Sequence, residues 1–106
     1  MDGGTRSAGR PDRPAVSAPC RVQVAGLSAT AQLADIGLGG LGLVVASQPE
    51  LFEPDMPFQV SVEGLGVVEV ECRWRRGNRI GAQFADEDAV QDQVRAFLAA
   101  RGITLG

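Results

Sequence analysis

Short stretches in which apolar and polar residues alternate recur along most of the chain. The clearest covers residues 68–75, where Val68, Val70, Cys72 and Trp74 occupy every second position. A period of two is typical of a β-strand that buries one of its faces. The same pattern, or a short apolar run bounded by turn residues, predicts strands at residues 20–25, 29–35, 41–45, 58–63, 68–75 and 79–84.

The end of the chain has a helical period instead. The apolar residues that fall on one stripe of this helix are Val90, Val94, Phe97 and Leu98. We expect the helix over about residues 86–101, capped by Asp86 or Asp88 and ended by Gly102. Six short strands followed by one helix, without strand–helix–strand alternation, predict an all-β fold, a six-stranded antiparallel β-barrel closed by a C-terminal α-helix.

The beginning of the chain shows no periodicity. Residues 1–19 are rich in glycine, serine, alanine and proline, and Pro11, Pro14 and Pro19 favour an extended backbone. We therefore predict a flexible N-terminal arm over residues 1–19 and a single barrel domain over residues 20–106.

The composition excludes several kinds of function. The chain has no histidine, and Cys20 and Cys72 lie too far apart for a CxxC motif, so neither a metal site nor histidine-based catalysis is expected. We predict that the protein is not an enzyme and has no cofactor, and that both cysteines are buried reduced thiols. A net charge of −3 argues against general binding to DNA. No apolar run is long enough for membrane insertion, and the N-terminus lacks the pattern of a signal peptide, so the expected location is the cytoplasm.

Positive charge is concentrated at two places, and arginine carries all of it. Residues 22–72, which lie between the two, contain seven acidic residues and no basic one. The first cluster lies in the arm and the second on the last predicted strand pair: Arg6, Arg10 and Arg13, then Arg73, Arg75, Arg76 and Arg79. Arginine side chains bind phosphates in a forked geometry and stack on flat rings. Solvated strand ends are the alternative explanation for the second cluster.

An acidic residue and a glycine cluster follow the second predicted strand, in the sequence Asp-Ile-Gly-Leu-Gly-Gly over residues 35–40. Residues 37–42 form a literal GxGxxG, but a strand follows this motif where a dinucleotide fold needs a helix. The glycines are instead expected at a bulge or a tight bend, where the absence of side chains lets an anionic ligand approach. The carboxylate of Asp35 can accept hydrogen bonds from a guanine edge. With the arginines, this combination indicates a nucleotide clamp.

Trp74 is the only tryptophan of the chain. Strict alternation places it on the same face as Val70 and Cys72, which predicts a position in the core or at its edge. The alternative is a position at the barrel mouth, where the ring contacts a planar base.

Together these features resemble the PilZ family, bacterial domains that bind the second messenger cyclic di-GMP, over about residues 9–101. The family has an RxxxR motif in its N-terminal arm and a [D/N]xSxxG motif on the barrel. Residues 35–40 fit the second motif, except that Gly37 stands where serine is expected. Arg13 lies at the usual distance before Asp35, although Gly9 stands four positions earlier. A literal RxxxR runs from Arg6 to Arg10.

The resemblance implies roles for these residues. The arm arginines, either Arg6 with Arg10 or Arg10 with Arg13, would clamp the phosphates and stack on guanine. Asp35 would accept hydrogen bonds from guanine, and Gly40 would permit its close approach, while Gly37 lacks the hydroxyl of the family's serine.

Two hypotheses about function remain open at this point. In the first, the chain is a single-domain cyclic di-GMP receptor whose arm is ordered by the ligand and then engages a protein partner. In the second, it is a PilZ-fold adaptor that binds no nucleotide and acts through protein contacts.

Overall fold

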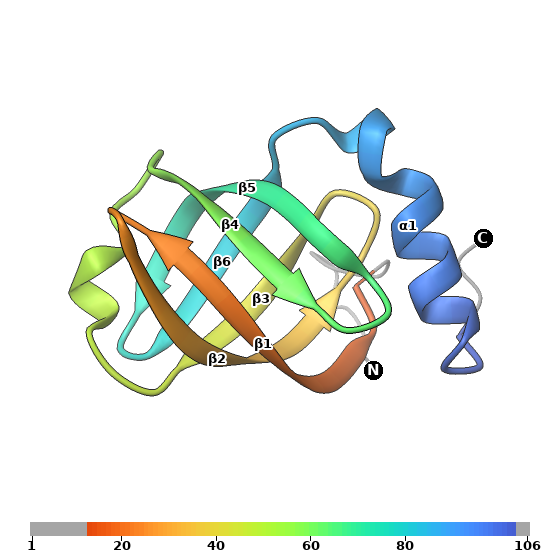
Figure 1. Ribbon diagram of the computed structural model, residues 1–106, viewed down its shortest axis with the longest axis horizontal. Helices are drawn as coiled ribbons and strands as arrows, with labels where there is room; N and C mark the ends of the chain where they lie inside the picture. Colours follow the sequence, from red (N-terminus) through yellow and green to blue (C-terminus); the bar gives the residue numbers. More distant parts are fainter. Residues whose placement is uncertain (1–12, 104–106) are drawn as a thin grey trace, which may run out of the picture.

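A computed structural model, which describes residues 13–103, shows a closed six-stranded antiparallel barrel with one C-terminal helix (Figure 1). This arrangement confirms the predicted fold class. The elements follow one another in the order β1 (Ala15–Val24), β2 (Leu27–Ile36), β3 (Gly40–Val45), the short 3-10 turn η2 (Pro49–Leu51), β4 (Pro57–Val62), β5 (Gly66–Arg76), β6 (Arg79–Phe84) and α1 (Glu87–Ala99).

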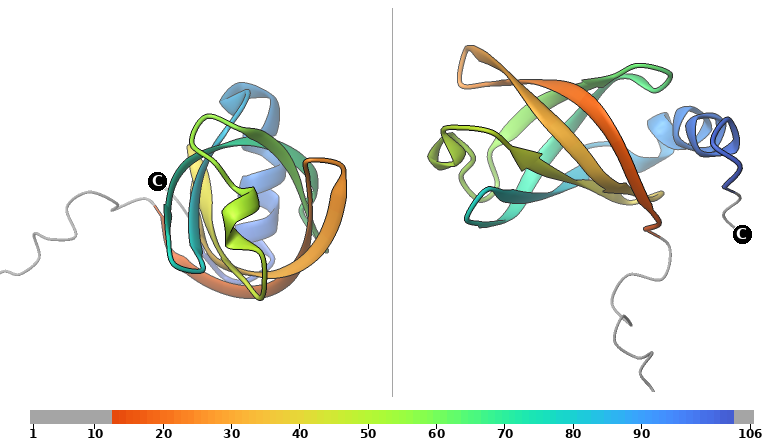
Figure 2. Two further views of the ribbon diagram at one scale, coloured as in Figure 1. Left: turned by 90° about the vertical axis from the view of Figure 1, so that its left-hand side faces the viewer. Right: turned by 90° about the horizontal axis from the view of Figure 1, so that it is seen from below.

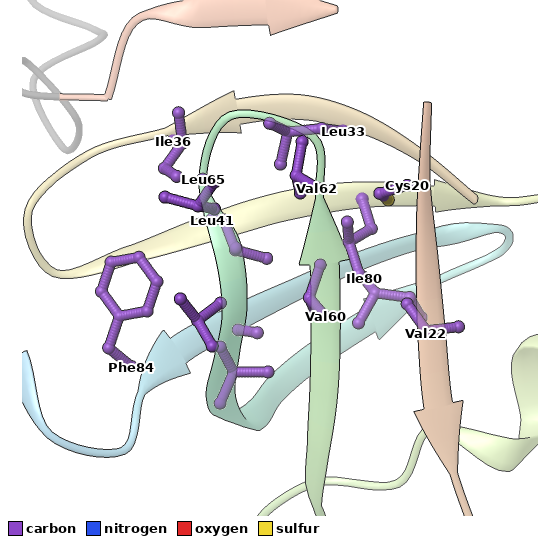
Figure 3. Close-up of a cluster of buried hydrophobic side chains, with 14 of the residues drawn as sticks. Cys20, Val22, Leu33, Ile36, Leu41, Val60, Val62, Leu65, Ile80 and Phe84 are labelled. Carbon is purple, nitrogen blue, oxygen red and sulfur yellow. The ribbon is translucent and has the colours of Figure 1, made fainter. Parts of the chain in front are cut away.

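The strands enclose a single apolar core. Neighbours around the ring follow the order β1-β2-β3-β6-β5-β4, and β4 pairs with β1 to close it (Figure 2). Every second residue of β1, from Val16 to Val24, is buried, and the residues between them are exposed. Figure 3 shows Val22, Val60 and Ile80, which come from three different strands, inside this ring. Period-two alternation therefore positions the core as the sequence predicted.

Helix α1 covers the end of the barrel next to the β4–β5 hairpin (Figure 1). Phe97 is buried and lies against Gly64 of that hairpin. Gln93 donates a hydrogen bond of 3.0 Å to the carbonyl of Leu65. Apolar packing and this polar contact together fix the helix over the barrel end.

Local signals determine both ends of α1. Asp86 is the N-cap, and its carboxylate accepts a hydrogen bond of 3.3 Å from the backbone N–H of Ala89. Beyond the other end, Gly102 has a φ of +78°, a conformation that glycine adopts without steric cost. No helix within the described part of the chain is long and apolar enough to cross a bilayer.

The predicted boundary between the arm and the barrel is wrong. Strand β1 begins at Ala15, so residues 15–19 belong to the barrel. Val16 is buried and continues the alternation of β1. Pro19 is tolerated because β4 pairs with β1 only from Cys20 onward, so the proline has a strand neighbour on one side only.

Candidate functional site

Four residues on neighbouring strands form a row on the outer surface of the barrel. Asp35 of β2 lies opposite Gly42 of β3, Gly42 lies opposite Gly81 of β6, and Gly81 lies opposite Trp74 of β5. Residues that are directly paired point to the same face of a sheet. With strands about 4.8 Å apart, the row spans roughly 14 Å.

A β-bulge turns Asp35 to this outer face. The register between β2 and β3 shifts between Leu33 and Asp35, so Ala34 is an extra residue on β2. Leu33 is fully buried, and unbroken alternation would send Asp35 into the core as well. Because of the extra residue, Asp35 lies on the outer face of the barrel and Ile36 is the next side chain in the core.

A second bulge does the same for Trp74, so the prediction that Trp74 shares a face with Cys72 is wrong. The register between β5 and β6 shifts between these two residues, and Arg73 is the extra one. Cys72 is fully buried, whereas Trp74 is half-buried and lies against the outer side of Gly81. A bulge adds a residue only relative to the partner strand, so alternation along β5 alone could not reveal it.

The two glycines of the row lie beneath the two side chains at its ends, Gly42 beneath Asp35 and Gly81 beneath Trp74. A β-carbon added at Gly42 would lie 2.7 Å from Oδ2 of Asp35, and one added at Gly81 would overlap the indole ring of Trp74. Both side chains therefore lie over positions that any larger residue would occupy. The absence of side chains at the two glycines leaves the room in which Asp35 and Trp74 pack against β3 and β6.

Arg13 is the one arm arginine that the structure describes, and it is paired with Asp35. Its Nε donates to Oδ1 of Asp35 over 2.9 Å, and its Nη2 lies 2.6 Å from the same oxygen. Both side chains are largely buried, with 16% of Arg13 and 24% of Asp35 exposed. The backbone N–H of Ile36 also donates to the carbonyl of Pro14 over 3.3 Å, which extends the β1–β2 pairing to the residue after Arg13.

A groove of about 340 Å³ contains Arg13 and the Trp74 end of the row. It is lined by Arg13, Gly39, Gly40, Arg73, Trp74, Gly81, Ala82, Gln83 and Glu87. A larger groove of about 420 Å³ lies elsewhere, where Gln23, Gln59 and Glu69 contribute to its wall. That second groove has no cation in its lining, so the smaller groove suits an anionic ligand better.

Charged side chains of both signs surround the smaller groove. Besides Arg13, it contains Arg73, whose Nε donates to Oε1 of Gln83 over 2.7 Å and whose Nη1 donates to Asp55 over 3.0 Å. Glu87, the first residue of α1, brings a carboxylate to the groove, near Gly39. The two arginines favour a phosphate, and the carboxylate opposes it.

Trp74 also contacts the second arginine cluster. The guanidinium carbon of Arg76 lies 5.4 Å from the centre of the indole ring, within the range of a cation–π interaction. Arg76 and Arg79 are directly opposite each other across the β5–β6 pair, and the turn between them has Gly77 at a φ of +60°. The basic hairpin predicted from the sequence is therefore next to the groove.

The remaining predicted glycines have structural roles. The N–H of Gly37 donates to the carbonyl of Gly40 over 2.9 Å and closes the turn between β2 and β3. A side chain at Gly40 would collide with the carbonyl oxygen of Ala82 on β6. Glycine is thus required at position 40 by strand packing, a reason different from the ligand approach that we predicted.

Two predicted ligand residues, Arg6 and Arg10, lie outside the described residues. Conversely, three members of the site, Gly42, Gly81 and Glu87, were not predicted from the sequence. The pairing of Gly42 with Gly81 joins strands that are far apart in sequence, and Glu87 enters through the docking of the helix. No local pattern could have indicated these contacts.

Comparison with known proteins identifies the same fold. A family model described as "PilZ domain" matches residues 5–100. No curated protein matches the sequence.

Among solved structures, the PilZ domain of CeSA from a cellulose-synthesizing bacterium is similar with a TM-score of 0.63 and 14% identity, over 84% of this chain and 97% of that one. The PilZ domain of YcgR from Escherichia coli with c-di-GMP has a TM-score of 0.62 and 21% identity, over 85% and 89% of the two chains. At these identities the likeness shows a shared fold.

Proposed function

The chain belongs to the PilZ domain family, and we propose that it is a single-domain receptor that binds cyclic di-GMP in the groove between Arg13 and Trp74. The observation that carries this proposal is the row of Asp35, Gly42, Gly81 and Trp74, in which Asp35 holds Arg13 at the groove and Trp74 brings an aromatic ring to the same groove. The structure of the Escherichia coli YcgR domain with c-di-GMP supports the choice of ligand.

Each part of the groove suits a different part of such a ligand. Arg13 uses two of its five N–H donors on Asp35, so three further donors can serve a phosphate. Arg73, which is also paired with Asp55 and Glu71, adds a second positive charge to the groove. The indole of Trp74 offers a flat surface for a base, a contact that is typically worth about 1–3 kcal/mol.

The arm would complete the binding site, and its ordering would signal that ligand is bound. Arg6 and Arg10 precede Arg13 closely enough to reach the same phosphates once the arm folds over the groove. Ordering a segment on binding costs conformational entropy, which lowers affinity and suits a reversible switch. We propose that the ordered arm then presents a surface to a protein partner in the cytoplasm.

One further function is favoured by two specific features. Gly37 supplies no hydroxyl, and Glu87 places a carboxylate in the groove. Loss of one hydrogen bond to a charged group costs roughly 1.5–3 kcal/mol, which is about tenfold or more in affinity. A PilZ-fold adaptor that binds no nucleotide and acts through protein contacts is therefore the second candidate.

Isothermal titration calorimetry with cyclic di-GMP distinguishes the two candidates. If the protein is a receptor, the wild type should give saturable heat. Arg13→Ala should bind at least tenfold more weakly, because it lacks an arginine that can donate two hydrogen bonds to a phosphate. Arg21→Ala is the matched control, because this exposed arginine of β1 lines a different pocket. Absence of heat at high protein concentration would overturn the receptor proposal and leave the adaptor.

The same titration determines which arginines of the N-terminal segment bind the phosphates. If Arg6 and Arg10 contribute, the double substitution Arg6→Ala/Arg10→Ala weakens binding beyond the loss seen in the Arg21→Ala control. Unchanged affinity would leave Arg13 as the principal phosphate ligand of the N-terminal segment.

A further inference from the structure

We propose that a second row on the outer surface of the barrel, formed by Gln32, Val44, Arg79 and Arg76, is a docking surface for a protein partner. The partner binds this docking row with a short segment that carries acidic residues next to apolar ones. The inference goes beyond the proposed function, because neither the docking row nor its partner requires a nucleotide in the groove.

The register of four strands builds the docking row. Gln32 of β2 lies opposite Val44 of β3, and Val44 lies opposite Arg79 of β6. Arg79 in turn lies opposite Arg76 of β5. Paired residues share a face of the sheet, so the row spans roughly 14 Å at about 4.8 Å per strand. Trp74 of the candidate site lies two residues before Arg76, so the docking row is next to that site.

The basic end of the docking row is a pair of like charges. Arg76 and Arg79 are both exposed and directly opposite each other, an arrangement that is destabilising by itself. Within the described part of the chain, neither forms an ion pair with a carboxylate, whereas Arg13 and Arg73 both do. Arg76 contacts the ring face of Trp74, which leaves its N–H donors for another group. An anion supplied by another molecule would relieve the repulsion.

The other end of the docking row is apolar. A groove of about 400 Å³ lies there, and none of the described residues that line it is charged. Its apolar lining consists of Pro19, Ala31, Val44, Val45 and Ala46. Val44 also pairs with Arg79, so the apolar groove and the basic end form one continuous surface.

This surface suits a short peptide segment. An arginine guanidinium binds a carboxylate through two parallel hydrogen bonds, and the groove accepts an apolar side chain. An extended peptide rises about 3.3 Å per residue, so roughly four residues cover the docking row. The segment therefore needs acidic residues at Arg76 and Arg79 and an apolar residue beside Val44.

Two other classes of partner fit less well. The net charge of −3 repels a nucleic acid, and a phosphate backbone would leave the apolar groove unused. A lipid surface is held by apolar side chains that insert into it, but the hairpin tip between Arg76 and Arg79 consists of Gly77 and Asn78. A protein segment uses both halves of the docking row.

Fluorescence anisotropy with the full-length protein and labelled synthetic peptides tests the proposal. The probe has two leucines next to four glutamates, in both orders, at about 0.15 M salt, where long-range attraction is screened. A second peptide has glutamines in place of the glutamates, and a third has serines in place of the leucines. We expect saturable binding of the probe and binding of the second peptide that is weaker by roughly tenfold or more. The third peptide should bind several-fold more weakly than the probe.

Variants locate the binding surface. Arg76→Glu/Arg79→Glu should bind the probe at least tenfold more weakly, because both carboxylate partners are lost. Arg21→Glu/Arg95→Glu makes the same change in net charge at exposed positions elsewhere, so its affinity should stay within about twofold of the wild type. Val44→Gln should bind the probe and the serine peptide equally. Partial unfolding of this variant weakens both peptides by the same factor and leaves their ratio intact.

Several outcomes would overturn the proposal. Equal losses in the two double variants would indicate a general charge effect. Absence of probe binding would also overturn it, whether or not the protein binds phosphatidylglycerol vesicles or a single-stranded oligonucleotide. Binding of cyclic di-GMP without binding of the probe would remove the docking row and leave the receptor proposal standing. Binding of the probe without the dinucleotide would do the reverse.

Discussion

Gly81 of β6 lies directly beneath the indole ring of Trp74, its cross-strand partner on β5. The ring occupies the space that a side chain at position 81 would need. The position of the aromatic wall of the groove thus depends on a glycine in the neighbouring strand.

Substitution Gly81→Ala should move this ring. The new β-carbon would overlap the indole, so Trp74 must rotate into solvent, and its fluorescence emission should shift to longer wavelength. Because Trp74 is the only tryptophan, the spectrum reports on this site alone. The crowding should also lower the free energy of unfolding by about 1–3 kcal/mol.

Gly39→Ala is the matched control for this substitution. A β-carbon there would meet its nearest atom, in Glu87, at 3.7 Å, an ordinary contact distance. Its emission spectrum should equal that of the wild type. If Gly81→Ala also left the spectrum unchanged, the contact between Gly81 and Trp74 described above would be wrong.

Removal of the negative charge of Glu87 should strengthen dinucleotide binding. The carboxylate lines the groove and repels phosphate, and in a solvated setting such an interaction is worth on the order of 1 kcal/mol. Glu87→Gln should therefore bind cyclic di-GMP roughly two- to fivefold more tightly, as measured by calorimetry. Asp88→Asn removes the same charge from the same helical turn but not from the groove, so its affinity should stay at the wild-type value. Equal gains in both variants would indicate a general charge effect.

Stability at alkaline pH should depend on the two buried thiols. Burial raises the pKa of Cys20 from 9.0 to about 11, and burial is also the main cause that raises the pKa of Cys72. The folded protein then keeps protons that the unfolded chain releases, so the stabilisation is complete below pH 9 and is lost as pH rises toward 11. The chain has no lysine and no tyrosine, so cysteines are the side chains that titrate in this interval.

Chemical denaturation between pH 8 and pH 11 measures this effect. The wild-type free energy of unfolding should fall over the interval, and Cys20→Ala should show a smaller fall. A wild-type curve that is flat up to pH 11 would contradict the assignment of Cys20 as a buried thiol.

The fold was predictable from the sequence because its signals are local. Alternation positioned the strands, and Asp86 marked the start of the helix. The arm boundary was wrong because the prolines and small residues of residues 15–19 hid a continuing alternation of buried residues. For residues 15–19, amino-acid composition was therefore a weaker indicator of structure than the period-two alternation of buried residues.

The site was only partly predictable. Arg13 and Asp35 were both candidates, and the structure pairs them. The faces of Asp35 and Trp74, however, depend on bulges at Ala34 and Arg73, which exist only relative to the neighbouring strands. The pairing of Gly42 with Gly81 depends likewise on the register between β3 and β6, which no single stretch of sequence encodes.

The most direct test of the account is a titration of the isotope-labelled protein with cyclic di-GMP, followed by two-dimensional amide NMR. We expect the largest shifts at the backbone N–H groups of Gly42 and Gly81 and at the indole N–H of Trp74, with little change at Gln23 and Gln59 in the larger groove. Shifts centred on Gln23 and Gln59, with Gly42, Gly81 and Trp74 unmoved, would contradict it.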